Sequence, residues 1–216
     1  MQNGDLAWRL SRLYLAPLAR LLTRGRAYGL DRFPRTGGCV LAINHLHWVD
    51  IPLVGGLSPR TINYLAKVEA HKYPGLGEFI AWHGTIAVRR GESDRDAVRM
   101  MREAVRNGRA LGIFVEGTRQ KSGHPGPAQP GAAMAAIQEN VPVVPIAVYG
   151  TQFWKITNLA PCSIAVGEPV MYDGLPKGGR GYKEATADIE RRILALWEWL
   201  AEVHAQGRPK GLTPPL

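Results

Sequence analysis

The chain has 216 residues, of which 45% are hydrophobic and 21% charged, a composition typical of one compact globular domain. Its formal net charge of +9 favours an anionic partner: nucleic acid, an acidic membrane surface, an acidic carrier protein or a phosphorylated substrate. The apolar runs are too short for a membrane-spanning helix, and the N-terminus lacks the features of a signal peptide. Cys39 and Cys162 lie in apolar stretches, which favours reduced core cysteines in a protein that faces the cytosol.

Residues 1–30 predict an amphipathic, basic helix. Apolar side chains recur at helical spacing, whereas Arg9, Arg12 and Arg20 fall on the opposite side. This pattern fits a helix that lies in a membrane interface, but a surface helix packed on the core gives the same pattern. The residues that we expect to contact a membrane are Trp8, Leu10, Leu13, Tyr14, Leu18 and Leu21.

After residue 30, short apolar runs alternate with segments of helical pattern. The runs CVLAIN, NYLAKV, GTIAVR, LGIFVE, VPVVPIAVY and SIAVG predict strands. Helices are expected after Asp50 and over residues 74–82, 93–107, 131–139 and 182–205. This alternation predicts an α/β domain over residues 31–205, with a mixed, largely parallel sheet flanked by helices. The tail, residues 206–216, is expected to be loose.

The stretch NHLHWVD, residues 44–50, follows the first predicted strand and combines polar groups that a core does not need. His45 and Asp50 can meet if the histidine lies in the strand-to-helix turn and Asp50 begins the helix. The carboxylate would then fix the tautomer, leaving the other ring nitrogen to accept a proton. No G-x-S-x-G motif supplies a nucleophile, so a hydroxyl of the substrate becomes the expected attacking group. A metal site and a merely polar strand end remain alternatives.

Two other predicted strands end in groups suited to bind an anion. FVEGTR, residues 114–119, offers a turn with backbone N–H groups, a hydroxyl and the guanidinium of Arg119. GTIAVRR, residues 84–90, ends in Arg89 and Arg90. Two such ends in one sheet favour an anion pocket over solvated surface charges.

Together these stretches resemble the conserved blocks of the glycerolipid acyltransferases, the family of 1-acylglycerol-3-phosphate acyltransferases. NHLHWVD contains the H-x-x-x-x-D of that family, and FVEGTR resembles its F-P-E-G-T-R block, with Val115 in place of the proline and Gln120 where serine is common. KVEAHKYPGLGEFIAWHGTIAVRR resembles its second block and VPVVPIAV its last. The four blocks run in order from about Asn44 to Val148.

The resemblance implies transfer of an acyl chain from acyl-CoA or acyl carrier protein to the hydroxyl of a lysophospholipid, without a metal or other cofactor. His45 is then the expected general base and Asp50 its partner, whereas His47 is expected to transfer no proton. The residues that we assign to substrate binding are Asn44, Lys67, Gly84, Arg89, Glu116, Gly117, Thr118 and Arg119.

The acceptor implied by the resemblance is 1-acylglycerol-3-phosphate, which would become phosphatidic acid. Another lysophospholipid or a lyso-ornithine lipid is an alternative acceptor, and a thioester or lipid hydrolase is an alternative activity that the same His–Asp pair would serve. Because the acceptor is a lipid, we expect a peripheral protein on the anionic, cytoplasmic face of the membrane. A nucleic-acid partner is not expected, since the sequence has no helix-turn-helix, zinc or aromatic-rich RNA-binding signature.

Overall fold

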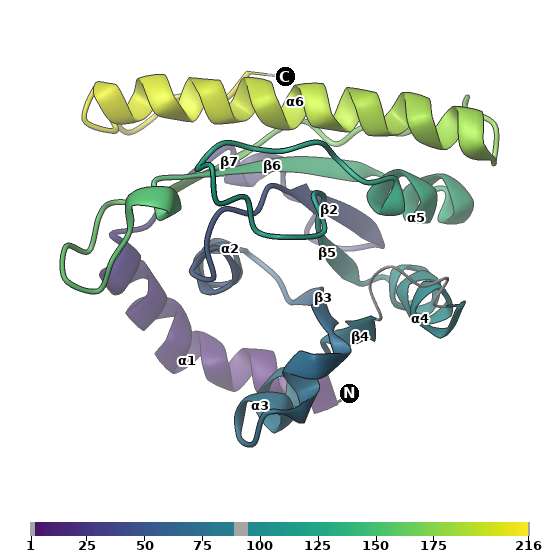
Figure 1. Cartoon of the computed structure of the whole chain (residues 1–216), viewed down its shortest axis with the longest axis horizontal. Helices are drawn as coiled ribbons and strands as arrows, with labels where there is room; N and C mark the ends of the chain where they lie inside the picture. Colours follow the sequence, from purple (N-terminus) through teal and green to yellow (C-terminus); the bar gives the residue numbers. More distant parts are fainter. Residues whose placement is uncertain (1–2, 89–94, 216) are drawn as a thin grey trace.

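The computed structural model describes residues 3–88 and 95–215 and contains one twisted sheet in this part of the chain (Figure 1). Its strands run in the order β1-β7-β6-β2-β5-β3-β4. All neighbouring pairs are parallel except β6 and β7, so the expected mixed, largely parallel sheet is confirmed. The strands are β1 (Arg26–Tyr28), β2 (Cys39–Ile43), β3 (Ile62–Lys67), β4 (Ile86–Val88), β5 (Ala110–Phe114), β6 (Val143–Tyr149) and β7 (Ser163–Val166).

Helices cover both faces of this sheet. On one face α2 (Asp50–Leu57) packs on the strands, with α1 (Asn3–Thr23) and α3 (Leu76–Trp82) outside it. On the other face lie α4 (Arg95–Arg106), α5 (Gly131–Glu139) and α6 (Gly179–Ala205) (Figure 1). Three short 3₁₀ helices, η1 (Leu30–Arg32), η2 (Val68–Lys72) and η3 (Thr151–Phe153), complete the described elements. None of the helices in the described residues is both long and apolar enough to cross a membrane.

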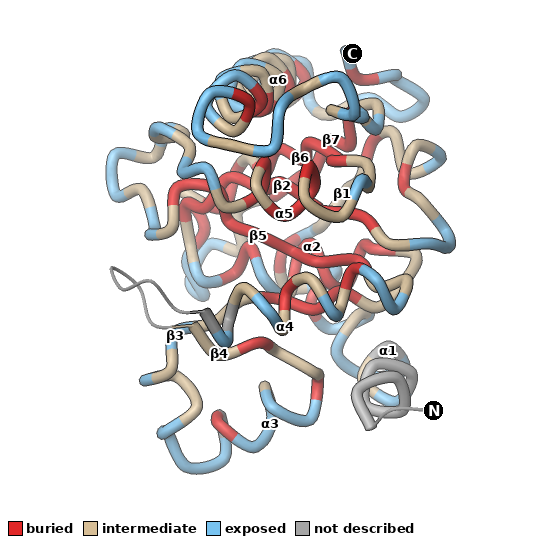
Figure 2. Tube along the Cα trace, turned by 90° about the vertical axis from the view of Figure 1, so that its right-hand side faces the viewer, coloured by how far each residue is buried: buried red, intermediate tan, exposed pale blue. Residues whose placement is uncertain are grey.

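The core lies on both faces of the central strands, which explains why these strands read as continuous apolar runs. Leu41 and Ile43 of β2 join the cluster under α2, whereas Val40 and Ala42 point into the cluster under α4, α5 and α6. Figure 2 shows the resulting buried layer running through the middle of the molecule. Polar side chains at the ends of these strands are therefore the exceptions that need an explanation.

The predicted helix over residues 1–30 ends earlier than expected. Arg24 has a positive φ of 45°, and the N–H of Gly25 donates to the carbonyl of Arg20 at 2.9 Å, which closes α1. The next residues form β1, which pairs with β7 and which the sequence did not reveal because three residues carry no readable period. The helix predicted over residues 93–107 corresponds to α4, and its expected start at Ser93 lies outside the described residues.

The C-terminal tail, which we expected to be loose, is held against the edge of the sheet. The Arg208 guanidinium donates to the carbonyls of Arg24 and Cys162, at 2.8 and 3.2 Å. The Tyr28 hydroxyl donates to the carbonyl of Pro209 at 3.1 Å, and Pro214 is buried. The tail therefore continues the domain as far as residue 215.

Strand β3 divides its pairing between two neighbours. Its first half, Ile62–Tyr64, pairs with β5, and its second half, Leu65–Lys67, pairs with β4. The sheet therefore splits beyond Tyr64, which carries β4 and α3 away from the central strands (Figure 1).

Candidate active site

His45 and Asp50 meet in the turn between β2 and α2. His45 follows the end of β2 by two residues, and Asp50 is the first residue of α2, so the turn folds the carboxylate back onto the ring. Nδ1 of His45 lies 2.8 Å from Oδ2 of Asp50, which assigns the Nδ1–H tautomer. Nε2, the other ring nitrogen, has no hydrogen-bond partner among the described residues and can accept a proton.

The Asp50 carboxylate also organises the turn itself. Its Oδ2 atom accepts hydrogen bonds from the backbone N–H groups of Leu46 and His47, at 2.7 and 2.8 Å. Asp50 is fully buried, so these contacts and His45 replace the water that a free carboxylate would bind. The carboxylate thus fixes the backbone and the ring of the turn at once.

The peptide groups on either side of His45 are held by the turn after β5. The His45 N–H donates to both carboxylate oxygens of Glu116, at 3.2 and 3.0 Å. The N–H of Gln120 donates to the His45 carbonyl at 2.8 Å. The His45 ring stacks on Phe114, the last residue of β5, with 4.0 Å between the ring centroids. Residues far apart in the sequence therefore set the position of this imidazole together.

Glu116 itself is buried and carries an altered acidity. Burial raises the pKa of its carboxyl to about 7, and the negative charge of Asp50 adds to this. Hydrogen bonds from the backbone of Glu116, His45 and Gly126 act in the opposite direction. We assigned Glu116 to substrate binding, but its oxygens face the His45 backbone, so its contact in this structure is a structural one.

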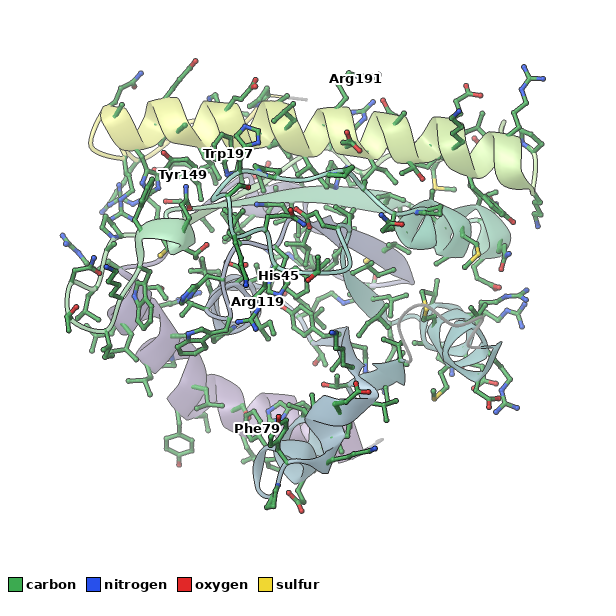
Figure 3. All side chains as sticks on the ribbon, in the orientation of Figure 1. His45, Phe79, Arg119, Tyr149, Arg191 and Trp197 are labelled. Atoms are coloured by element: carbon green, nitrogen blue, oxygen red, sulfur yellow. The ribbon has the colours of Figure 1, made fainter. Side chains whose placement is uncertain are left out.

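The rest of the E-G-T-R turn points outward. Gly117 has a φ of 69°, a left-handed conformation that favours glycine, and its N–H donates to the Phe114 carbonyl at 3.0 Å. Thr118 and Arg119 are exposed, and Figure 3 shows Arg119 beside His45, near the carboxyl ends of the central strands. Burial lowers the pKa of His47, and the nearby Arg119 guanidinium lowers it further, while Asp50 opposes both. Arg119 is thus a cation that the structure brings beside the His45–Asp50 turn.

Two residues assigned to substrate binding have other roles in the structure. The amide of Asn44 is fully buried, accepting from the N–H of Val148 at 2.6 Å and donating to its carbonyl at 3.1 Å. Asn44 therefore extends the pairing of β2 with β6, and both polar atoms of its amide are bonded within the protein. Gly84 lies before β4, away from the carboxyl ends of the strands, and its N–H is bonded to the Ala81 carbonyl. Both assignments stay predictions, and the structure shows the Asn44 amide and the Gly84 N–H bonded within the protein.

Of the remaining predicted cations, Lys67 ends β3 and Arg89 follows β4 in the sequence. Lys67 is exposed at the end of β3, where it is paired with Val88. Arg89 follows Val88 directly and lies outside the described residues. In the part of the chain that the structure describes, no three His, Cys, Asp or Glu side chains gather as metal ligands would.

An apolar pocket of about 540 Å³ opens beside the catalytic turn, and the sequence did not reveal it. Its walls come from α1, α2 and α3, from the Tyr64 side of the split in the sheet, and from Trp48 and Trp154. The Tyr64 ring stacks on Phe114, which in turn stacks on His45, so the pocket wall lies two rings from the imidazole. The small residues Ala16, Ala19 and Gly56, where α1 approaches α2 closely, were the signal available in the sequence.

The predicted membrane face of α1 is exposed from Leu10 on, where its side chains are described. Leu10, Leu13, Tyr14, Leu18 and Leu21 all show large exposed fractions, up to 74% for Tyr14. The side chain of Trp8 lies outside the described part of the chain. The other side of the helix packs on α2, where Ala19 is buried.

Comparisons of the sequence with known proteins identify related chains. The model of the acyltransferase family matches residues 24–149, more than half of the chain. A 1-acyl-sn-glycerol-3-phosphate acyltransferase from Bacillus subtilis (strain 168) is 28% identical over 147 residues, 67% of this chain and 73% of the relative. A lyso-ornithine lipid O-acyltransferase from Pseudomonas aeruginosa is 37% identical over 146 residues, 66% of this chain and 54% of the relative.

A solved structure has the same fold. The 1-acyl-sn-glycerophosphate acyltransferase PlsC from Thermotoga maritima superposes with a TM-score of 0.73, over 95% of this chain and 84% of that one. Its sequence is 23% identical, so this likeness concerns the fold alone. Its coverage extends the agreement beyond the 24–149 region to most of the elements described above.

Proposed function

Because the chain belongs to the acyltransferase family, we propose that it moves a fatty acyl chain from a thioester to the free hydroxyl of 1-acylglycerol-3-phosphate, forming phosphatidic acid. The donor would be acyl-CoA or acyl carrier protein. The observation that carries this proposal is a buried His–Asp pair at the meeting point of an apolar pocket and an exposed arginine. Such a site suits a substrate that has a long apolar chain, a hydroxyl and an anionic headgroup.

In the proposed reaction, Nε2 of His45 removes the proton from the acceptor hydroxyl as its oxygen attacks the thioester carbonyl. The tetrahedral intermediate collapses with cleavage of the carbon–sulfur bond, and the thiolate leaves and takes up the proton that the imidazolium carries. Asp50 stabilises that imidazolium through the 2.8 Å contact at Nδ1. A thiol ionises far more readily than an alcohol, so a strong second acid is not required.

We expect the apolar pocket and the cationic residues near His45 to bind different parts of the substrate. A fatty acyl chain fits the pocket between α1, α2 and α3, whose walls are almost entirely aliphatic and aromatic. Arg119 would bind the acceptor phosphate in a bidentate manner, and Lys67 and Arg89 are further candidates at the carboxyl ends of β3 and β4. Thr118 and Gly117 would contact the glycerol from the same turn.

We further propose that the protein lies on the cytoplasmic face of the membrane as a peripheral protein. The exposed apolar residues of α1 would enter the interface, and the net charge of +9 favours anionic headgroups. A lysolipid could then reach the pocket from the bilayer, because α1 forms both the proposed membrane face and one wall of the pocket.

A second acceptor is favoured by a specific observation. The Pseudomonas aeruginosa relative named for a lyso-ornithine lipid is 37% identical, a higher figure than the 28% of the Bacillus subtilis relative. A lyso-ornithine lipid also carries an acyl chain with a free hydroxyl but lacks a phosphate. Arg119 would then contact the carboxylate of the ornithine headgroup, which a guanidinium binds equally well.

One panel of assays tests these proposals. Purified protein is given acyl-CoA or acyl carrier protein donors and a set of lyso-acceptors, and the products are identified by lipid mass spectrometry. Transfer should depend on both the acceptor and His45, and the His45→Ala variant should lose it while its circular dichroism spectrum stays unchanged. Release of free fatty acid without an acceptor would instead indicate a hydrolase, and turnover retained by His45→Ala would refute the general base.

A further inference from the structure

A second apolar surface lies beside the C-terminal end of α1, on the loop that follows β6. We call it the β6 loop, residues 151–162. Phe153 and Ile156 point outward and are 59% and 67% exposed. Thr151, before them, and Trp154, between them, are buried. The loop therefore displays two large apolar side chains, while its buried residues Thr151, Trp154 and Cys162 fix it to the domain.

This loop has a built internal structure. The side chain of Asn158 accepts hydrogen bonds from the N–H groups of Lys155 and Ala160, at 2.9 and 3.0 Å, and donates to the Phe153 carbonyl at 3.0 Å. Leu159 also donates from its N–H to the Lys155 carbonyl at 2.9 Å. Backbone groups that leave water need internal partners, and the N–H groups of Lys155, Leu159 and Ala160 in this loop already have them.

Contacts join the loop to α1 and to the catalytic turn. The Trp154 indole donates to the Leu22 carbonyl at 2.9 Å, and the N–H of Cys162 donates to the Thr23 carbonyl at 2.8 Å. Trp154 packs edge-on against Trp48, which is 52% exposed and lies between His45 and Asp50 in the sequence. Figure 1 shows the loop beside the end of α1. Both tryptophans also line the apolar pocket.

From this arrangement we infer that the β6 loop is a second lipid-contacting element, which inserts Phe153 and Ile156 into the membrane surface next to the pocket. The inference takes the membrane as partner from the proposed function, but the residues that carry it are not part of α1. Residues 151–162 contain Lys155 and no Asp or Glu, which suits an anionic lipid surface. Tryptophan at the edge, as in Trp48, is typical of side chains at the lipid–water interface.

The consequence is that the membrane borders the pocket on two sides, at α1 and at the β6 loop. An acyl chain can then pass from the bilayer into the pocket without crossing water. Because Trp154 of the loop packs against Trp48, binding of the loop to the membrane also brings Trp48, which lies between His45 and Asp50 in the sequence, to the lipid surface.

The test compares the double variant Phe153→Ser, Ile156→Ser with a control that removes exposed apolar side chains elsewhere. The control is Met171→Ser, Leu212→Ser, whose residues are 43% and 37% exposed. Flotation with vesicles of phosphatidylcholine and phosphatidylglycerol should show about a tenfold or greater loss of partitioning for the loop variant, because two large side chains no longer leave water. The control should partition like the wild type.

A second measurement reports on the loop directly. Cys39 and Cys162 are fully buried, so an Ile156→Cys variant can be labelled selectively with an environment-sensitive fluorophore, whose emission should shift to the blue on vesicles. The inference is overturned if this shift is absent, if the loop variant floats like the wild type, or if sedimentation shows that the surface joins two copies of the chain in place of lipid.

Activity separates this inference from the proposed function. With a short-chain acceptor that is monomeric in water, the loop variant should keep the wild-type rate, and it should lose rate only with an acceptor embedded in vesicles. Wild-type protein that transfers no acyl chain but floats through the loop would refute the proposed function alone. Transfer that is normal on vesicles despite the loop variant would refute the loop alone.

Discussion

Replacing Asp50 by asparagine removes the charge beside His45 with little change in shape. The amide oxygen can keep the position of Oδ2, which accepts from His45 Nδ1 and two backbone N–H groups, and the amide nitrogen can take the place of Oδ1, which has no hydrogen-bond partner among the described residues. The contact is 2.8 Å between nitrogen and oxygen. With the charge centres roughly 4 Å apart and an effective dielectric constant of about 20, the imidazolium would lose about 4 kcal/mol of stabilisation.

That loss corresponds to a reduction of about a thousandfold in kcat, because each 1.36 kcal/mol of barrier is about tenfold in rate. The assay is thiol release from acyl-CoA at saturating acceptor, with KM for both substrates measured alongside. The matched control is His47→Asn, whose ring lies in the same turn but forms no hydrogen bond to His45 among the described residues, and which should stay within a few-fold of the wild type. An Asp50→Asn variant that retains a tenth or more of the wild-type kcat would refute the electrostatic role of Asp50.

Further predictions concern the residues around this pair. Burial raises the pKa of Glu116 to about 7 from an ordinary 4.5, so the folded state holds more protons than the unfolded state between these pH values. The free energy of unfolding should therefore fall by up to about 3 kcal/mol as pH rises through this window. Urea unfolding at pH 5 and 8 should show this loss and Glu116→Gln should reduce it, whereas an equal loss in the wild type and the variant would contradict the assignment. Asn44→Ala should lower the free energy of unfolding by about 2–5 kcal/mol, because Val148 loses both buried partners; a change confined to KM would mean that Asn44 contacts substrate after all. Arg119→Ala should raise KM for an anionic acceptor by about tenfold or more, as expected when a charge-assisted pair is lost, while Lys121→Ala, an exposed neighbour, should not; a change in donor KM alone would place the phosphate elsewhere.

The sequence predicted the central strands because each is buried on both faces and therefore reads as an unbroken apolar run. It also predicted that His45 and Asp50 meet, since five residues suffice for a strand to turn into a helix. It missed β1 because Arg26–Tyr28 is short and follows an amphipathic helix without a change of pattern. It missed the hold on the C-terminal tail because those contacts, such as Arg208 to Arg24, join opposite ends of the chain.

Residue type alone could not give the direction of a side chain. Asn44 adjoins the proposed general base His45 in sequence, yet its amide hydrogen-bonds to Val148 of β6. Glu116 belongs to a block that suggests contact with substrate, yet its carboxylate faces the His45 backbone. For the apolar pocket the sequence offered only an indirect signal, the small residues where α1 approaches α2, because the pocket walls come from three helices and from the divergence of strands, which no local pattern specifies.

The divided pairing of β3 makes α3 and β4 a semi-independent unit of the domain. This unit supplies one wall of the pocket, through Phe79, Ile80 and His83, but none of the contacts that hold His45. Side chains there can become larger or smaller without disturbing the imidazole, so pocket depth and reaction chemistry can vary separately. If the pocket takes the acyl chain as proposed, related enzymes could diverge in the length of the chain they accept while keeping the same His–Asp turn, and an engineer could use the same freedom.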